Sequence, residues 1–586
     1  MSTLTIHKEP IVCKGSPASP GIAIGPIFIH HKYEPIVLEK KLTSDEIELE
    51  LNRVRDSVER SSKELNKILE FAREKLGDDQ AKILEAQVLI LQDKVLMDSI
   101  RKRLKKEKKN AEFVVTEEFS KYHQIMLAAK DEYTRERAQD VEDVRLRILR
   151  NLQEEKLISK FDRACIIVAY NFSPADTLIF SRNDVMAYVS DIGGITSHTA
   201  ILARAMKIPA VVGMRDLATK VHSNDNLIVC GYSGTLIINP NKEQIVEYLA
   251  KQKLHKEFEE NLREVAPFPA ETLDGHKVSL QANVELASEI EFVHHQGADG
   301  VGLYRTEVLL LGGEVFPTEE EQYLNYKRLA ESIYPKPVII RTFDIGGDKM
   351  TVHSIRENNP FLGWRGIRLM LDKEDLFLEQ LRAILRASVR RNVSVMFPMV
   401  TAINEVRKAK QLVFKAQDQL REKGISFDEH MPIGVMVEVP AAAVIADNLA
   451  REVDFLSIGS NDLIQYLLAV DRDNELVADL FQEFHPSVVR FVRRIIERGS
   501  KGKVWVGMCG EMAGHPLATI LLLGLGLQEF SVNPNVLPEI KKIIRSIHYS
   551  EAVEAAKKCL EMGTAEEIKE YLDRLLRTKF PDILID

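Results

Sequence analysis

The spacing of apolar residues first sets apart a helical region in the N-terminal third of the chain. Between about residues 36 and 158, apolar side chains recur every three or four positions, as at Leu51, Val54 and Val58, and glycine and proline are nearly absent. This is the period of an amphipathic helix, and several helices of this length form a bundle. A purely structural bundle would have the same pattern.

Short runs of β-branched residues lie on both sides of this helical region. Lys14–His30 is typical of a strand region punctuated by glycine and proline, and further strand-like runs alternate with helical stretches from Ala164 onward. These runs are Cys165–Ala169, Val185–Val189, Ala210–Val212 and Asn226–Val229. The pattern predicts a small α/β unit into which the helical region is inserted.

The second half of the chain alternates regularly between strand-like and helix-like segments. A charged helical stretch, Lys242–Glu264, precedes it and ends at Pro267 and Pro269, so we interpret it as a linker. Eight apolar runs follow: Val278–Val284, Gly300–Tyr304, Val338–Phe343, Ser394–Met399, Gly434–Val437, Asp454–Ile458, Val504–Met508 and Glu529–Val532. A helix-like stretch follows each run, which predicts a (β/α)8 barrel, with a doubly wound sheet as the competing fold.

Composition excludes several classes of protein. The net charge is -9, from 79 basic and 88 acidic side chains, which argues against a nucleic-acid binder. The five cysteines form no C-x-x-C pair, so a reducing cytoplasm fits better than a disulfide framework or a zinc site. Met1–Lys14 has no apolar signal segment, and the longest apolar stretch, Ala518–Leu527, is too short to span a bilayer. We therefore expect a cytoplasmic protein without membrane insertion.

Four arginines follow predicted barrel strands or lie in the adjoining loops, where the chemistry of this fold takes place. They are Arg305, Arg341, Arg365 and Arg472. Guanidinium groups bind phosphate and carboxylate groups through two parallel hydrogen bonds. Any one of them alone is more often a surface ion pair, but four in such positions favour a site for a small phosphorylated anion.

Two carboxylates and one thiol lie at neighbouring strand ends. Glu438 and Asp462 offer oxygen ligands, which favour Mg2+ beside a phosphorylated substrate, although ion pairs to the arginines would also explain them. Cys509 could be a small apolar residue of the core. At a strand end it could instead act as an acid, because a thiol keeps its proton at neutral pH.

A histidine lies where a strand of the α/β unit runs into a helix, in the segment Asp191–Arg204, DIGGITSHTAILAR. Thr196 or Ser197 could cap this helix, which would put His198 in its first turn. Free N–H groups and the helix dipole favour an anion there, so His198 could accept a phosphoryl group. The alternative is a capping histidine without chemistry.

The string GGITSHTAILAR resembles the phosphohistidine signature shared by Enzyme I of the bacterial phosphoenolpyruvate:sugar phosphotransferase system, pyruvate phosphate dikinase and phosphoenolpyruvate synthase. The resemblance to Enzyme I runs from Ser19 to Ser546, and no segment is left for the ATP-grasp domain that the other two need. It implies transfer of a phosphoryl group from phosphoenolpyruvate to His198 and then to a histidine of the phosphocarrier protein HPr. Pyruvate would be released, in the first step of sugar uptake.

The same resemblance implies roles for the barrel residues and a homodimer formed through the barrel. Glu438 and Asp462 would bind Mg2+, and Cys509 would be the proton donor. Together with the argument from charge, the expected substrate-binding residues are Arg305, Arg341, Arg365, Asn461, Asp462 and Arg472.

The helical insert resembles the family's docking platform for HPr. Its most recognisable piece is Asp131–Leu152, where Asp140 and Asp143 belong to a predicted acidic face that suits a basic partner. Gln87 stands where enteric sequences have a histidine, which puts the details of carrier docking in doubt.

The expected architecture is an α/β protein with a swivelling N-terminal phosphohistidine domain, an inserted helical bundle and a C-terminal (β/α)8 TIM barrel. The phosphohistidine domain would comprise residues 1–35 and 159–240, the carrier-binding insert 36–158, the helical linker 241–269, and the phosphoenolpyruvate-binding and dimerisation barrel 270–586.

Overall fold

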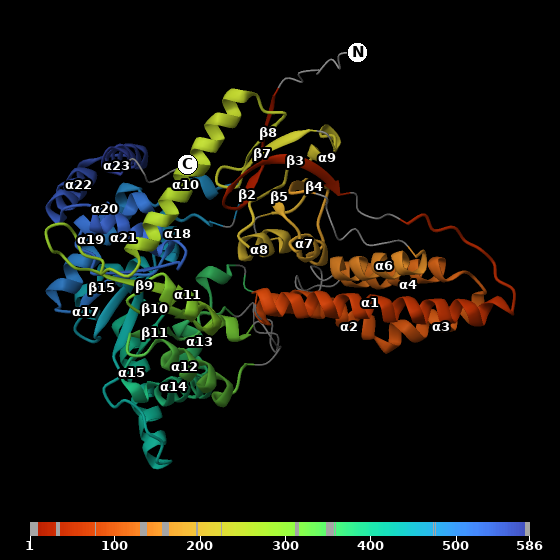
Figure 1. The fold of residues 1–586 in the computed structure, drawn as a ribbon. Helices are drawn as coiled ribbons and strands as arrows, with labels where there is room; N and C mark the ends of the chain where they lie inside the picture. Colours follow the sequence, from red (N-terminus) through yellow and green to blue (C-terminus); the bar gives the residue numbers. More distant parts are fainter. Residues whose placement is uncertain are drawn as a thin grey trace. The chain divides into compact units, whose positions relative to one another are not determined.

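Figure 1 shows the fold of the chain in a computed structural model. It describes residues 10–30, 35–76, 78–128, 138–154, 163–194, 197–223, 225–310, 316–346, 357, 359–472, 474 and 476–580. The chain divides into two compact units, and the division falls between Lys256 and Glu257. This point lies inside one continuous helix, α10 (Lys242–Val265), which agrees with the charged helical stretch expected from the sequence.

The first unit contains an eight-stranded sheet with the order β1-β8-β7-β3-β4-β5-β6-β2. Its strands are β1 (Ile11–Lys14), β2 (Ser16–Ser19), β3 (Ile22–His30), β4 (Cys165–Ala169), β5 (Val185–Ser190), β6 (Ala210–Val212), β7 (Asn226–Cys230) and β8 (Thr235–Ile238). The helices of the sheet region are α7 (Pro174–Phe180), α8 (His198–Ala205) and α9 (Leu217–Lys220). Strands β3, β4, β5 and β6 pair in parallel, and the remaining pairs are antiparallel.

A helical insert separates β3 from β4, as the sequence predicts. It consists of α1 (Glu46–Leu76), α2 (Asp78–Gln92), α3 (Lys94–Glu107), α4 (Ala111–Leu127) and α6 (Ala138–Leu152). Buried residues at helical spacing, such as Leu65 and Val144, pack in the same apolar cluster as Leu178 and Leu202 of the sheet region. One hydrophobic core therefore joins the insert to one face of the sheet.

One expectation for the insert is overturned when side chains are considered. Asp140 is buried, 4% exposed, and accepts a hydrogen bond from the amide Nε2 of Gln87 at 3.1 Å. The prediction that Asp140 belongs to an exposed acidic face is therefore wrong, because its side chain is buried between packed helices, where a polar group needs a hydrogen-bond partner. Gln87 is itself only 1% exposed, so it supports the packing of α2 on α6. Residues 131–137 of the platform segment lie outside the described residues.

The second unit is a closed barrel of eight parallel strands in the order β10-β11-β12-β13-β14-β15-β16-β9. They are β9 (Ser279–Val284), β10 (Val301–Arg305), β11 (Val338–Arg341), β12 (Val393–Phe397), β13 (Ile433–Val437), β14 (Phe455–Ile458), β15 (Trp505–Met508) and β16 (Glu529–Val532). All eight expected strands are confirmed, and closure of the sheet rules out the doubly wound alternative.

Helices follow the strands around the barrel (Figure 1, green to blue). They are α11 (Ile290–His295), α12 (Glu319–Ile333), α13 (Ile367–Asp372), α14 (Glu374–Ala387), α15 (Ile403–Glu422), α16 (Pro440–Val444), α17 (Ala446–Leu449), α18 (Ser460–Leu468), α19 (Pro486–Lys501), α20 (Pro516–Gly524), α21 (Leu537–Arg545), α22 (Tyr549–Glu561) and α23 (Ala565–Lys579). Within the described ranges, no helix has the length and apolar character needed to cross a membrane.

The barrel interior depends on a small residue beside a large ring. A Cβ atom on Gly434 would overlap the ring of Phe455, which is stacked on Trp505 with the ring centroids 4.6 Å apart. We expect Gly434→Ala to lower the free energy of unfolding by about 1–3 kcal/mol, because the stacked ring cannot yield. Denaturant unfolding of the whole chain would measure this change. Gly563→Ala, where the nearest atom would be 3.7 Å away, should have little effect. Equal losses in both variants would contradict the packing argument.

Candidate active site

The C-terminal ends of the barrel strands carry a dense network of arginines and carboxylates. Arg341, the last residue of β11, forms ion pairs with Glu307 at 3.0 Å and Asp344 at 3.4 Å. Asp344 also accepts two hydrogen bonds from Arg365, at 3.2 Å from Nε and 2.8 Å from Nη2. The carboxylates around it raise the pKa of Arg341 despite its burial. Two fully charged guanidinium groups are thereby held side by side by one buried carboxylate.

Backbone geometry holds this network in place. Gly366, next to Arg365, has φ +56°, and a Cβ atom there would come within 2.9 Å of Met399 and 3.2 Å of Asp344. Met399 itself has φ +58° and donates its backbone N–H to Glu438 at 2.5 Å. Non-glycine residues rarely adopt this conformation, and such backbone tends to cluster at functional sites.

Glu438 is an almost completely buried carboxyl group that follows β13. Its exposed fraction is 1%. Burial raises its pKa well above the ordinary value, the charges of Asp462 and Asp344 raise it further, and Arg341 opposes them. Four acidic groups, Glu307, Asp344, Glu438 and Asp462, therefore surround two guanidinium groups. An added cation would relieve this repulsion.

Asp462 lies in the first turn of α18, where it approaches Arg365 at 3.9 Å. Burial and then the charge of Asp344 raise its pKa, and Arg365, Arg341 and Arg472 oppose this. Within the described ranges, no set of three or more histidine, cysteine, aspartate or glutamate side chains is arranged as a metal cage. Two carboxylates are nevertheless enough for Mg2+, which usually takes its other ligands from water and substrate phosphate.

Three further candidates form a more exposed rim. Arg305 ends β10 and pairs with Glu285 at 2.8 Å. Asn461 donates to the Glu511 carboxylate at 3.0 Å and accepts from the Glu511 backbone N–H at 2.8 Å. Arg472 approaches the same carboxylate at 3.5 Å. Exposed ion pairs of this kind are weak, so these arginines can exchange their partners for an anionic ligand at low cost.

Cys509 follows β15 and is buried at the same end of the barrel. It is 2% exposed, and its Sγ lies 3.8 Å from the carbonyl oxygen of Ile458. Burial raises its pKa to about 11, although the Ser457 hydroxyl and the positive charge of Arg341 lower it. The thiol is therefore protonated at neutral pH and can serve as an acid, whereas it is a poor nucleophile.

His198 belongs to the other compact unit, where it is the first residue of α8. Ser197 caps this helix by accepting the backbone N–H of Ala200 at 3.4 Å, which agrees with the expected helix start. Gly193 has φ +108° in the loop that leads to it, so glycine suits this sharp change of direction. Thr196, the other capping candidate, lies outside the described residues.

The structure gathers Arg341, Arg365, Glu438 and Asp462 into one buried network, with Arg305, Asn461 and Arg472 in ion pairs or hydrogen bonds at strand ends or in the adjoining loops. Sequence reasoning missed Glu307, which forms an ion pair with Arg341. Its carboxylate also holds the loop after β11 in place by accepting the backbone N–H of Asp344 at 2.7 Å. Glu307 lies two residues after Arg305, the last residue of β10, and this position near a strand end could have marked it as a candidate.

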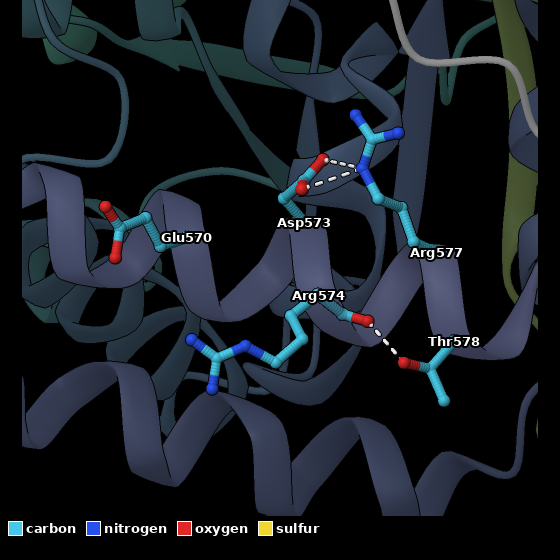
Figure 2. A pocket seen from close by; sticks show the side chains of 5 residues that line it. All are labelled: Glu570, Asp573, Arg574, Arg577 and Thr578. Carbon is cyan, nitrogen blue, oxygen red and sulfur yellow. Dashed lines mark hydrogen bonds and ion pairs between the residues drawn. The ribbon is translucent and has the colours of Figure 1, made fainter.

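A separate hollow of about 440 Å³ lies along α23 (Figure 2). It is lined by Glu570, Asp573, Arg574, Arg577 and Thr578. Asp573 and Arg577 form an ion pair with each other at 2.8 Å, as Figure 2 shows. All five residues come from successive turns of one helix, and none is a predicted site residue, so this hollow adds nothing to the chemistry of the barrel.

Three segments of the chain match families of phosphoenolpyruvate-utilising enzymes. Residues 14–137 match the family described as PEP-utilising enzyme, N-terminal, residues 161–234 match the mobile domain, and residues 259–549 match the PEP-binding domain. The fold and these matches define the class: the chain is a phosphoenolpyruvate-utilising enzyme.

Full-length relatives narrow this class. The chain is 40% identical over 564 residues to the phosphoenolpyruvate-protein phosphotransferase of Haemophilus influenzae. The matched residues cover 95% of this chain and 98% of the relative. It is 41% identical over 568 residues to that of Listeria monocytogenes, covering 96% and 98%. For Geobacillus stearothermophilus the identity is 40% over 567 residues, covering 96% and 97%. The chain belongs to the phosphoenolpyruvate-protein phosphotransferase family and is a transferase.

Proposed function

We propose that this protein transfers the phosphoryl group of phosphoenolpyruvate to its own His198 and then to a histidine of the phosphocarrier HPr, and releases pyruvate in the first step of sugar uptake. The observation that carries this proposal is the buried arginine–carboxylate network at the end of the barrel strands, in a chain of this family. The reaction would take place in the cytoplasm.

The arginines would bind the two anionic ends of the substrate. Arg341 and Arg365 hold their charge in a buried setting, where an ion pair with a phosphate is stronger than in water. Arg305, Arg472 and Asn461 would bind the remaining oxygens by giving up their exposed carboxylate partners. Charge that develops on the transferring group would then be stabilised without rearrangement of the buried groups.

Glu438 and Asp462 are the residues that would hold Mg2+. They fit this ion because both are partly desolvated carboxyl groups whose ionised forms repel each other and Asp344. When bound, the ion would neutralise phosphate charge and help to orient the substrate. The protein's own contribution is to hold both carboxylates beside Arg341 and Arg365, so that a phosphate and a divalent cation are bound together.

His198 would accept the phosphoryl group at the start of α8. The N–H groups of the first turn and the helix dipole favour the added negative charge. The helical insert, residues 36–158, would bind the carrier, and the barrel would form the homodimer. Residues 1–35 and 159–240 would act as the swivelling phosphohistidine domain, with 241–269 as linker and 270–586 as barrel domain.

The decisive test is incubation of the protein with phosphorus-labelled phosphoenolpyruvate, Mg2+ and a histidine-containing carrier, followed by mapping of the label. We expect an acid-labile, base-stable label on His198 that moves to the carrier, with one pyruvate formed for each phosphoryl group transferred. Label on another residue, or none on the carrier, would contradict the proposal.

Cys509 would protonate the enolate that remains when phosphate departs. A carbon–hydrogen bond forms, the sulfur–hydrogen bond breaks, and the thiol becomes a thiolate. We expect Cys509→Ala to lower the steady-state rate of pyruvate formation by about 100-fold or more, since a positioned acid contributes this much. Phosphate exchange with the carrier should be unchanged. Cys559→Ala, a buried thiol on α22, is the matched control, and normal pyruvate formation by Cys509→Ala would show that the thiol only packs.

A further inference from the structure

A second buried acid lies inside the barrel, and the proposed reaction does not use it. Glu529, the first residue of β16, is 3% exposed. Its Oε2 accepts a hydrogen bond from Gln281 Nε2 at 2.8 Å, and its Oε1 has no hydrogen-bond partner among the described residues. Because Oε2 already accepts an N–H, a proton on this carboxyl group belongs on Oε1.

This oxygen is packed closely against two glycines of the barrel strands. A Cβ atom on Gly507 would lie 2.9 Å from Glu529 Oε1, and one on Gly302 would lie 3.1 Å from it. Cys509 follows β15 two residues after Gly507 and is therefore about 6.6 Å further along the direction of the strand. Glu529 Oε1, which lies against Gly507, is therefore one step below the proposed proton donor. The buried hydroxyl of Ser457, which is paired in register with Gly507, lies close enough to Cys509 to lower the pKa of its thiol and can bridge the two levels.

A strip of polar groups runs beside Glu529 to the backbone of Cys509. Ser531, the next inward position on β16, would contact a Cβ atom on Gly302 and donates its hydroxyl to Asn283 Oδ1 at 2.7 Å. Asn283 Nδ2 in turn donates to the carbonyl oxygen of Cys509 at 3.0 Å. Ser457 of β14, paired with Gly507, continues this strip on the other side of β15, whereas Leu303, Ile339 and Met396 line an apolar part of the interior. Polar groups are thus confined to one sector, which contains both acids.

The strip also reaches the opposite end of the barrel. Gln281 Nε2 donates to the hydroxyl of Ser279 at 3.0 Å as well as to Glu529. Ser279 begins β9 and is half-buried, whereas Gln281 and Glu529 are buried. The polar sector therefore joins the floor of the barrel, near Ser279, to the Cys509 end.

We propose that Glu529 is a positioning residue for the proton step, and that it returns a proton to the Cys509 thiolate after each turnover from inside the barrel. This inference rests on the proposed function. The O–H bond at Glu529 Oε1 breaks, the proton passes through one bridging hydroxyl or water to Sγ, and a sulfur–hydrogen bond forms. The resulting carboxylate regains its proton from solvent at the barrel floor.

The relative acidities of the two groups agree with this direction. Burial alone raises the pKa of Glu529 to about 8, and no charged side chain among the described residues contributes to that shift. The pKa of Cys509 is raised to about 11. Glu529 is therefore mostly protonated at pH 7, and a proton moves from it to the thiolate in the favourable direction. At the barrel mouth, bound substrate or product obstructs solvent, so an internal source shortens the recovery of the thiol.

The test is Glu529→Gln in the full-length protein, with Mg2+, phosphoenolpyruvate and a histidine-containing carrier. The amide keeps the shape and removes the transferable proton. We expect an unchanged first turnover in rapid-quench measurements, because the thiol begins protonated, and a steady-state rate about tenfold lower. Glu529→Asp, which keeps an acid, should recover part of the rate. Glu539→Gln is the control, since Glu539 is another largely buried carboxyl group, with a pKa raised to about 7, on α21 outside the barrel.

A pH profile separates this role from packing. In the wild type, the steady-state rate should fall above about pH 8 as Glu529 ionises, and this step should be absent in Glu529→Gln. An equal loss in the first and later turnovers would mean a structural role, and a full steady-state rate would mean that solvent at the mouth protonates Cys509. Either result overturns the proposal. Loss of the first turnover in the wild type would instead contradict the proposed function itself.

Discussion

Replacement of His198 by alanine is expected to abolish phosphorylation of the protein from either direction, by phosphoenolpyruvate and by phosphorylated carrier. The reason is that one imidazole is proposed to accept the group in both half-reactions, at the start of α8. Labelled phosphoenolpyruvate and labelled carrier, each mixed with the variant and analysed on denaturing gels, would measure the two reactions separately. No other histidine is expected to restore either reaction.

The control for this experiment is a histidine in the same compact unit. His222 is 71% exposed and lies near Asp225, three residues further on. His222→Ala should keep both half-reactions at the wild-type rate. The barrel of His198→Ala should still bind phosphoenolpyruvate in calorimetry, because its arginines lie in the other unit. Residual label on His198→Ala that is stable to base and labile to acid would contradict the assignment.

Replacement of Asp462 by asparagine is expected to slow phosphorylation by phosphoenolpyruvate but not phosphate exchange with the carrier. Phosphorylation by phosphoenolpyruvate should fall by about 100-fold or more, because charge stabilisation of the transferring group is the main contribution that a site of this kind makes. Acceptance of phosphate from the carrier should remain, since that step involves no barrel residue. Asparagine preserves the shape next to Arg365, so the fold should be retained.

Stopped-flow pyruvate detection across a range of Mg2+ concentrations would measure the first effect. A higher Mg2+ requirement in Asp462→Asn, and in Glu438→Gln, would support the assignment of both as ligands. Asp418→Asn on α15, where the carboxylate is 67% exposed, is the matched control. An equal fall in both half-reactions would mean that Asp462 acts through the fold instead.

The sequence predicts the barrel well because each strand is a short apolar run bounded by polar residues. Strands that are buried on both faces give such runs, so all eight are recognisable. It also places Arg341 and Glu438 correctly at strand ends, since the period of the fold fixes where a strand stops. The sequence does not show which loops lie next to one another in the folded chain. The pairing of Arg341 with Glu307, and of Arg365 with Asp344, joins residues 34 and 21 positions apart and leaves no periodic signal.

In the helical insert, the sequence predicts the helices but not which of their polar side chains are buried. Its helices are evident from apolar spacing, but the face on which a polar side chain lies depends on how neighbouring helices pack. Asp140 has an acidic side chain within a charged segment and is nevertheless buried against Gln87. Gln87 therefore takes part in an internal hydrogen bond, which composition could not reveal.

The division of the chain inside α10 has a consequence for recombination between relatives. The apolar clusters around Val144 and Val229 lie entirely before Lys256, and the barrel cluster around Met436 lies entirely after it. A gene exchange at this point would pass each core intact to the hybrid, so that an acceptor half and a donor half from different bacteria could be combined. If the proposed function holds, family members could in this way acquire a new carrier preference in one event while the proposed phosphoenolpyruvate site is inherited unchanged.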